Sequence, residues 1–327
     1  MVVVRKRTPQ GFVECPDVAS GCWIDARNVS AEDLVRLEND FGLSAELLAD
    51  IMDVDEQSRI ELEDEYTVII VRVPVYDTAL EAVYYTVPIG IILFADTIVT
   101  VCQRSSDAID DIALNRVRGL SMQGKPAFVL NILGRAALTY LKALKQLNRN
   151  AAHIEYALQK SVRNNELIQL LSTQKSLVYL TTSLKGNANV LERIKRIPSL
   201  KLKDDDCDLW EDVVTDNAQA LEMSNIYSSI MTGTMDAFAS VISNNLNIVM
   251  KRLALINIIL MIPTLIYSFY GMNVHLPFQD FAGMAFVITG FSLAAAVIGV
   301  WLVSWGSSTH EKINPKRKFL NDEHGQR

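Results

Sequence analysis

Residues 253–273 read LALINIILMIPTLIYSFYGMN, an almost unbroken apolar run that ends in Tyr270-Gly271-Met272-Asn273. Residues 282–305 form a second apolar run a few positions later. A bilayer core about 30 Å thick is crossed by about 20 helical residues. The second run has this length, and the first reaches it once it includes residues at the two interfaces. The sequence therefore predicts two membrane-spanning helices near the C-terminus rather than two buried helices of a soluble core.

The distribution of positive charge predicts the orientation of these spans. Lys251 and Arg252 precede the first span and four more basic residues lie within 312–318, whereas residues 271–281 contain no Lys or Arg. By the positive-inside rule, the N- and C-termini are cytoplasmic and the short loop lies outside. We expect a multi-pass protein of the cell (inner) membrane, embedded in the lipid bilayer. Since two helices cannot enclose an aqueous pore, a pore would need several copies around an axis.

The first span carries a polar stripe. At 100° per residue, seven positions spaced three or four apart fall on one side of the helix: Asn247, Met250, Ala254, Asn257, Met261, Thr264 and Ser268. The amide of Asn257 is costly in lipid unless it faces water or a polar partner. The stripe either lines a pore or packs against neighbouring helices through hydrogen bonds, and we favour the pore. In a pore, Met250 and Met261 would form apolar constrictions that can gate by losing water.

Pro263 and the small residues of the second span refine this arrangement. Pro263 removes one helical hydrogen bond and can bend the first span. The second span contains Gly283, Gly290 and Gly299 and the triplet 294–296 of alanines, which allow close helix contact. We expect the second span to lie outside the first as a supporting helix.

Charge divides the 327 residues into separate structural units. Residues 1–124 carry 10 Lys/Arg and 22 Asp/Glu, residues 125–203 carry 14 and 3, and residues 204–252 carry 2 and 9. The basic middle is not interleaved with aromatic residues, so a nucleic-acid partner is not expected. The predicted order is an α/β cytosolic head (1–124), an antiparallel helical hairpin (125–203), a stalk helix (204–252), a first transmembrane pore helix with the Gly-Met-Asn segment (253–273), an external loop (274–281), a second transmembrane helix (282–305) and a basic cytosolic tail (306–327).

Local patterns predict the elements of the cytosolic part. Ser30, with Asp33 three positions later, and Ser44 are expected to cap helices, and residues 23–25 to end a strand. Strands are predicted at 58–62, 66–75, 82–88, 89–94 and 97–102, and helices at 108–118, 126–163 and after 164–165 to about 194. From about Leu209 the helical pattern continues into the first span, which predicts one helix roughly 90 Å long.

Several functional classes are disfavoured by missing patterns. Cys15, Cys22, Cys102 and Cys207 form no CxxC pair, so we expect reduced, mostly buried thiols. The N-terminus lacks the apolar core of a signal peptide. The chain contains no HExxH, GxSxG or GxxxxGK[ST] sequence. An enzyme or an ATP-driven pump is therefore not expected, and no organic cofactor is implied.

Together these features resemble the CorA family of magnesium channels. The resemblance rests on Tyr270-Gly271-Met272-Asn273 directly after the first of two C-terminal spans, on the stalk, and on the segments 23–25, 50–53 and 76–77. It implies a funnel-shaped homopentamer in which the first span lines the pore and Gly271, Met272 and Asn273 meet an incoming hydrated Mg²⁺. Mg²⁺ sheds water reluctantly, so a ring of neutral amides suits a hydrated ion. Alternatively, Gly271 and Asn273 only cap a helix in left-handed geometry.

The resemblance also implies regulation by intracellular Mg²⁺ bound between cytosolic domains. Counting back from Asn273 places Asp212 and Asp236 at two stalk aspartates, and Asp77 is a partner from the head. The alternative for each is a solvated surface carboxylate. Two departures from the family stand out: the helical hairpin is basic, and the external loop has only one carboxylate, Asp280.

The leading hypothesis is a passive Mg²⁺ channel, with Co²⁺ and Ni²⁺ as further ions. The alternative within the superfamily is a transporter for Zn²⁺ or another transition metal, with or without proton coupling. His275 in the external loop bears on this choice, either as an ordinary loop residue or as a ligand for a softer ion. The alternative of another class is a membrane-anchored sensor or scaffold, which leaves the polar stripe unexplained.

Overall fold

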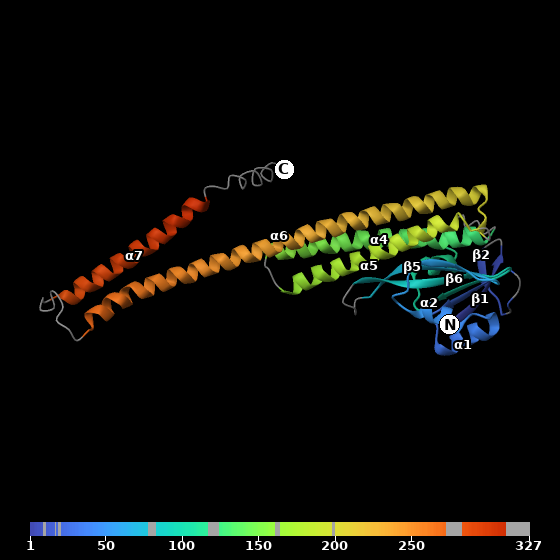
Figure 1. The fold of residues 1–327 in the computed structure, drawn as a ribbon, viewed down its shortest axis with the longest axis horizontal. Coiled ribbons are helices and arrows are strands. Elements are labelled where there is room, and N and C mark those ends of the chain that lie inside the picture. Colours follow the sequence, from blue (N-terminus) through green and yellow to red (C-terminus); the bar gives the residue numbers. More distant parts are fainter. Residues whose placement is uncertain are drawn as a thin grey trace. The chain divides into compact units, whose positions relative to one another are not determined.

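The computed structural model describes residues 1–8, 11–16, 18, 21–77, 83–116, 124–160, 164–197, 200–272 and 283–311. The chain divides into two compact units, Met1–Asp236 and Ala237–Arg327. The first unit is built on one mixed sheet covered by helices, and the second contains the latter half of one long helix and the whole of another (Figure 1).

The first unit holds a seven-stranded sheet in the order β2-β1-β3-β7-β6-β5-β4. Strands β3 and β7 are parallel, and the other neighbouring pairs are antiparallel. The strands are β1 (Val2–Thr8), β2 (Gly11–Glu14), β3 (Cys22–Arg27), β4 (Arg59–Leu62), β5 (Thr67–Tyr76), β6 (Tyr84–Leu93) and β7 (Ile98–Cys102).

Two short capped helices cover one face of the sheet. Helix α1 (Ala31–Phe41) begins with the predicted capping box between Ser30 and Asp33, and α2 (Ala45–Met52) begins at the predicted cap Ser44. Their apolar residues join the sheet in one buried cluster. The approach of α2 to β6 is close, since a Cβ at Gly90 would lie 2.3 Å from Cδ1 of Ile51.

Three other helices pack on the opposite face. Trp23 immediately precedes Ile24 in β3. Because neighbouring side chains of a strand point to opposite faces, Trp23 points away from α2. Its ring centroid lies 5.2 Å from that of Phe128. Its indole Nε1 donates to Thr100 Oγ1 at 2.9 Å. The helices of this face are α3 (Asp107–Ala113), α4 (Lys125–Lys160) and α5 (Asn164–Ile194).

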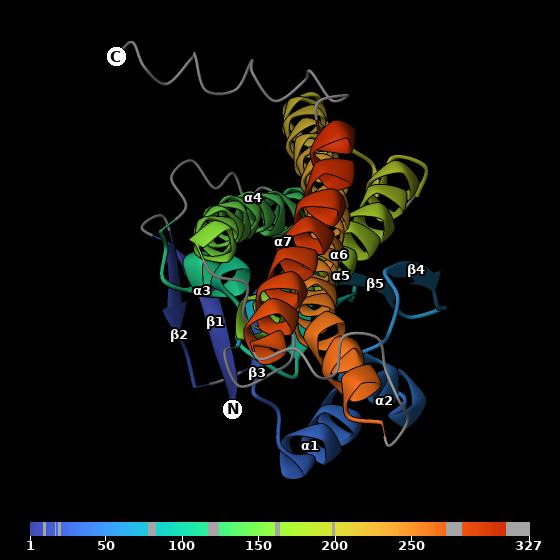
Figure 2. The same cartoon turned by 90° about the vertical axis from the view of Figure 1, so that its left-hand side faces the viewer.

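Helix α6 (Asp204–Tyr270) begins in the first unit and continues into the second. With 67 residues it is about 100 Å long at 1.5 Å per residue. Its first half is bonded to α5: Trp210 Nε1 donates to the Leu191 carbonyl at 2.9 Å, and Asn217 Nδ2 donates to the Leu184 carbonyl at 3.2 Å. In Figure 1, α4 and α5 run alongside this half of α6, and Figure 2 shows α4 and α5 on either side of it. Helix α7 (Met284–Glu311) lies in the second unit.

The α/β domain and the long helix predicted from the sequence are confirmed, and several local predictions need correction. The strands expected at 82–88 and 89–94 are one strand, β6, which pairs with β5 along its whole length. Pro88 is tolerated because β7 pairs with β6 only from Ile89 onward, so no ladder bond from its nitrogen is lost on that side.

Three further expectations differ from the structure. Residues 23–25 lie in the middle of β3 rather than at its end. Helix α3 stops at Ala113 instead of continuing to residue 118, and Asn115 adopts a φ of 55°. Strands β1 and β2 were not expected at all. Two cysteines, Cys22 and Cys102, are buried, whereas Cys15 and Cys207 are only partly buried, and none of these four described residues forms a disulfide.

Candidate ion pathway and regulatory carboxylates

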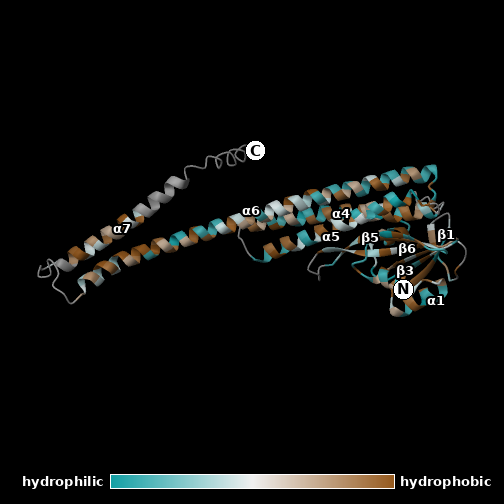
Figure 3. Ribbon diagram, in the orientation of Figure 1, coloured by the Kyte–Doolittle hydropathy of each residue, from teal (hydrophilic) through white to brown (hydrophobic). Residues whose placement is uncertain are grey.

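The second half of α6 has the length and composition of a membrane span. In the most apolar stretch of α6, no residue is buried. In α7, Phe286–Trp301 forms a shorter apolar helix. In Figure 3 the last turns of α6 are mostly hydrophobic. Helix α4 is also long and apolar enough to cross a bilayer, but 67% of its most apolar stretch is buried in the first unit. Its apolar residues therefore belong to the core of that unit.

Helix α7 packs closely on one side of α6. A Cβ at Gly299 would lie 2.9 Å from Cδ1 of Ile262 and 3.3 Å from Cγ2 of Ile258. Ser292 and Ala296 of α7 are also buried. Ser292, Ala296 and Gly299 follow one another at steps of four and three positions, so they lie on the same side of the helix. The hydroxyl of Tyr267 donates to Thr289 Oγ1 at 3.0 Å. Small residues on α7 thus permit the close contact that the sequence predicted for a supporting helix.

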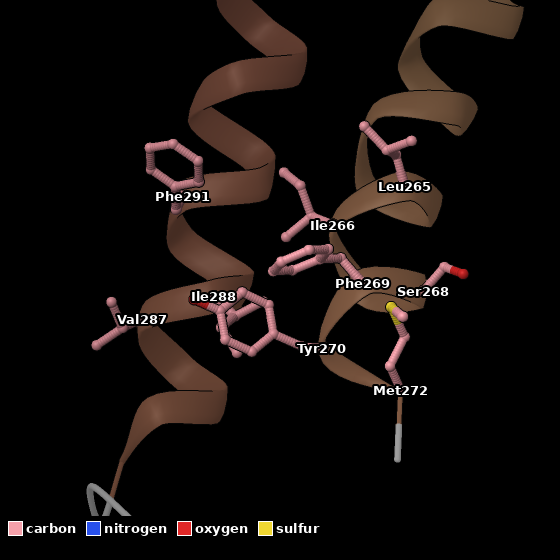
Figure 4. Close-up of a pocket in the computed structure, with 9 residues that line it drawn as sticks. All are labelled: Leu265, Ile266, Ser268, Phe269, Tyr270, Met272, Val287, Ile288 and Phe291. Atoms are coloured by element: carbon pink, nitrogen blue, oxygen red, sulfur yellow. The ribbon is translucent and has the colours of Figure 1, made fainter. Parts of the chain in front are cut away.

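The polar stripe lies on a different side of α6. All seven of its residues, from Asn247 to Ser268, are exposed in the single chain. On a helical wheel the centre of the stripe is roughly 110° from the Ile258, Ile262 and Ile266 side. Figure 4 shows the Ser268 side chain pointing away from α7, whereas Ile266 and Tyr270 point toward it. The chain's own second helix therefore leaves the stripe uncovered.

Two features modify the backbone along this stripe. Pro263 lies inside the helix, so the Ile259 carbonyl lacks its usual helical donor. The Thr264 hydroxyl donates to the Leu260 carbonyl at 2.6 Å. The hydroxyl is thereby fixed against its own backbone, and its oxygen keeps acceptor capacity for water.

The end of α6 shows the backbone of Gly271, the first residue of the Gly-Met-Asn segment. The helix ends at Tyr270, where the Gly271 amide still donates to the Tyr267 carbonyl at 2.9 Å. The described glycines with positive φ are Gly11, Gly21, Gly42 and Gly283. Gly271 is therefore not a left-handed helix cap. Met272 is about half exposed. Asn273, His275, Asp280 and the rest of the external loop lie outside the described residues.

A hydrophobic cleft of about 740 Å³ lies between the ends of α6 and α7 (Figure 4). It is lined by Leu265, Ile266, Ser268, Phe269, Tyr270, Met272, Val287, Ile288 and Phe291. Carbon atoms dominate this lining, so the cleft offers a hydrated cation almost no oxygen ligands.

The three aspartates expected to sense Mg²⁺ lie in the first unit, and the structure does not bring them together in one chain. Asp77 receives a hydrogen bond from Arg104 Nη1 at 2.9 Å. Asp212 is exposed in an open cleft of about 520 Å³ that Arg116 and Arg135 also line. Asp236 is exposed at the end of the unit. Among the described residues, no group of three or more His, Cys, Asp or Glu could hold a metal ion.

A buried ion cluster in the sheet is structural rather than part of an ion pathway. Asp25 is almost fully buried and accepts hydrogen bonds from Arg5 Nε at 3.2 Å and Arg27 Nη2 at 2.6 Å. Burial raises the pKa of Asp25 from its ordinary value, and the two arginines oppose this rise. Both guanidinium groups bind the Oδ2 atom of Asp25 and offset the negative charge of this carboxylate, as expected of a structural ion cluster.

Comparison with known proteins identifies the family of this chain. The family model for CorA-like Mg²⁺ transporter proteins matches residues 18–305. The chain belongs to the CorA family. A cobalt/magnesium transport protein CorA from Methanocaldococcus jannaschii is 27% identical over 260 residues, which cover 77% of this chain and 79% of the relative. The CorA of the same description from Thermotoga maritima is 23% identical over 262 residues, covering 79% and 74%.

A solved structure shows the same fold. The complete structure of the CorA magnesium transporter from Methanocaldococcus jannaschii superimposes with a TM-score of 0.78 at 23% identity, covering 92% of this chain and 96% of that one. The sequence-based assignment to the CorA family is therefore confirmed. The contact of α7 with Ile258 and Ile262, and the pairing of Asp77 with Arg104, were not visible in the sequence, because each joins positions that no local pattern connects.

Proposed function

We propose that this chain forms a homopentameric channel that carries Mg²⁺, and also Co²⁺, across the cell membrane down the electrochemical gradient. In this assembly α6 lines the pore, α7 surrounds it, and both termini are cytoplasmic. The relatives named as cobalt/magnesium transport proteins support this choice of ions. A divalent cation gains about 4.6 kcal/mol per 100 mV on entry, twice the value for one charge, so no ATP site is needed.

One observation carries the proposal: the polar stripe of α6 is exposed while α7 covers another side of the helix. An asparagine facing lipid would be costly, so the stripe needs water or another copy of the chain. A ring of copies with α7 outermost supplies both, because it turns every stripe toward a common axis. The alternative of a membrane-anchored scaffold gives no role to Asn257, Thr264 and Ser268.

The stripe suits passage of a hydrated ion. Asn257, Thr264 and Ser268 present amide and hydroxyl groups that can hydrogen-bond to a water shell without removing it. Met250 and Met261 separate these polar levels with flexible apolar side chains, which can close the pore by excluding water. At the outer end, a ring of Asn273 amides with Tyr270, Gly271 and Met272 would make the first contact with the ion.

Regulation by intracellular Mg²⁺ would involve more than one chain. Asp77 of one copy and Asp212 of its neighbour would share the ion, with Asp236 as a second position nearer the membrane. The absence of a three-ligand cluster among the described residues of one chain is consistent with a shared site. Facing carboxylates repel one another when no ion is bound, so bound Mg²⁺ would favour the closed state.

The function is tested with the full-length protein in liposomes. Uptake of Mg²⁺, Co²⁺, Ni²⁺ and Zn²⁺ is measured with and without a pH gradient under an inside-negative potential. We expect Mg²⁺ and Co²⁺ flux that depends on potential and not on the pH gradient. No flux of any ion would refute the channel, and flux of Zn²⁺ that requires the pH gradient would favour the coupled transporter.

Two variants test the assigned residues. Asn273→Ala should abolish uptake while the assembly keeps its wild-type size in detergent, and wild-type flux would remove Asn273 from the entrance. Asp212→Ala should weaken inhibition by internal Mg²⁺, and an unchanged inhibition curve would remove Asp212 from the sensor.

A further inference from the structure

Asp77 already has a cationic partner in its own chain. The carboxylate lies just after β5 and Arg104 lies just after β7, and their side chains meet at 2.9 Å. The Asp77 side chain is 22% exposed and that of Arg104 is 50% exposed. The pair therefore lies at the surface, where an ion from solution can reach the same carboxylate.

Arg104 is held in place from a second side. Its guanidinium carbon lies 5.6 Å from the ring centroid of Tyr85, a distance at which a cation is attracted to the ring face. Tyr85 belongs to β6, the strand between β5 and β7, and its ring is largely buried. The guanidinium therefore has a fixed resting position beside Asp77, and it would keep the ring contact after losing the carboxylate.

A guanidinium and Mg²⁺ need the same carboxylate oxygens. We infer that Arg104 is a built-in competitor of the regulatory cation at Asp77, and that it raises the intracellular Mg²⁺ concentration at which the channel closes. This inference rests on the proposed regulatory role of Asp77. When Mg²⁺ binds, the arginine leaves the carboxylate and stays over Tyr85; when Mg²⁺ falls, the arginine returns.

The surroundings of Asp212 support the same logic. Two further guanidinium groups, those of Arg116 and Arg135, line the cleft that contains Asp212. Arg135 lies 3.9 Å and Arg116 3.8 Å from Asp111, distances typical of loose ion pairs. Both carboxylates of the proposed sensor thus have arginines of the same chain nearby. The two guanidinium groups in the Asp212 cleft are each paired with Asp111, and their positive charge also opposes the binding of a cation in that cleft.

The size of the effect follows from the exposure of the pair. Exposed ion pairs of this kind are weak. Removing Arg104 should therefore lower the Mg²⁺ concentration that half-fills the site at Asp77 (the Mg²⁺ midpoint) by about two- to fivefold. A purely structural pair, which only ties the end of β5 to the end of β7, predicts a different result: the unfolding temperature without Mg²⁺ would fall, and the Mg²⁺ midpoint would not move.

The test uses Arg104→Gln in the full-length protein. Thermal unfolding in detergent is followed at increasing Mg²⁺, because an ion that binds the native state raises the unfolding temperature, and the Mg²⁺ midpoint of this rise is compared with wild type. Arg36→Gln is the matched control. Arg36 forms a surface ion pair with Asp40 at 3.2 Å, and this pair belongs to helix α1 and does not involve Asp77. We expect a midpoint about two- to fivefold lower in Arg104→Gln and unchanged in Arg36→Gln. An unchanged or higher midpoint in Arg104→Gln, or an equal shift in Arg36→Gln, overturns the inference.

Two further measurements separate this inference from the proposed function. In an Asp77→Asn background, Arg104→Gln should no longer move the midpoint, and a persisting shift would place the competition elsewhere and refute it. Liposome uptake is measured in parallel. If wild type shows no flux but Arg104→Gln lowers the Mg²⁺ midpoint, the channel fails and the competition stands. If wild type shows flux but Mg²⁺ leaves its unfolding unchanged, the regulatory site and this inference both fail.

Discussion

Gly299 offers a direct test of how α7 supports the proposed pore helix. A Cβ at this position would lie 2.9 Å from Cδ1 of Ile262 and 3.3 Å from Cγ2 of Ile258. Gly290 is a matched control in the same helix, because a Cβ there meets nothing within 4 Å. Both positions are therefore changed in parallel, first to Ala and then to Leu.

The contact distances give different magnitudes at the two positions. In a helix, Gly→Ala alone stabilises by about 0.5–1 kcal/mol. At Gly290 this gain should be seen in full. At Gly299 the Ile262 methyl is the end of a flexible side chain and can move, but the Ile258 methyl is nearer its backbone, so the gain is offset. Leu at Gly299 overfills the contact and should cost about 1–3 kcal/mol, whereas Leu at Gly290 should be close to neutral.

The assay compares thermal unfolding of the full-length variants in detergent with Mg²⁺ uptake in liposomes. Gly299→Leu should lower the unfolding temperature and reduce uptake, because the displaced α7 no longer holds the Ile258 and Ile262 side of α6. Equal behaviour of Gly299→Leu and Gly290→Leu, or a larger loss in Gly290→Leu, would show that α7 meets α6 through another face and would refute the reasoning.

Three other expectations concern single buried or polar groups. Asn187→Ala should destabilise the first unit by about 2–4 kcal/mol, since the Asn187 amide satisfies both the N–H and the carbonyl of Arg72 at 2.9 and 2.8 Å; urea unfolding measures this, and the exposed Asn165→Ala should leave the curve unchanged. Burial raises the pKa of Cys102 from 9.0 to about 12, so a maleimide at pH 8 should label Cys102 only after unfolding, and labelling of Cys102 itself in the folded protein would contradict the burial. The same shift contributes stability below pH 9 that is lost as the pH rises toward 12, because the unfolded thiol ionises first. Asn257→Leu should reduce Mg²⁺ uptake severalfold with assembly intact, and undiminished flux would remove the stripe from the pore.

Much of the first unit was readable from local chemistry. Ser30 and Ser44 predicted two helix starts correctly, because a capping hydroxyl acts within three residues of the helix that it begins. Strands β1 and β2 escaped notice because β1 has three valines followed by three basic residues instead of an alternating pattern, and its pairing with β3 supplies the order. Pro88 looked like a strand break and is not one, since its tolerance depends on where the neighbouring strand begins.

The sequence alone determined the family, the α/β domain and the continuous helix that leads to the Gly-Met-Asn segment, and it placed seven residues on one stripe of that helix. These features depend on composition and on periods of three and four residues, which are properties of neighbouring positions. The tertiary structure decided which side of α6 is covered, because Gly299 meets Ile258 and Ile262 only when two helices pack. It also decided that Asp77 is paired with Arg104, 27 positions away. Strands β5 and β7 are both antiparallel to β6, so their C-terminal ends, and with them the two side chains, lie at the same end of the sheet.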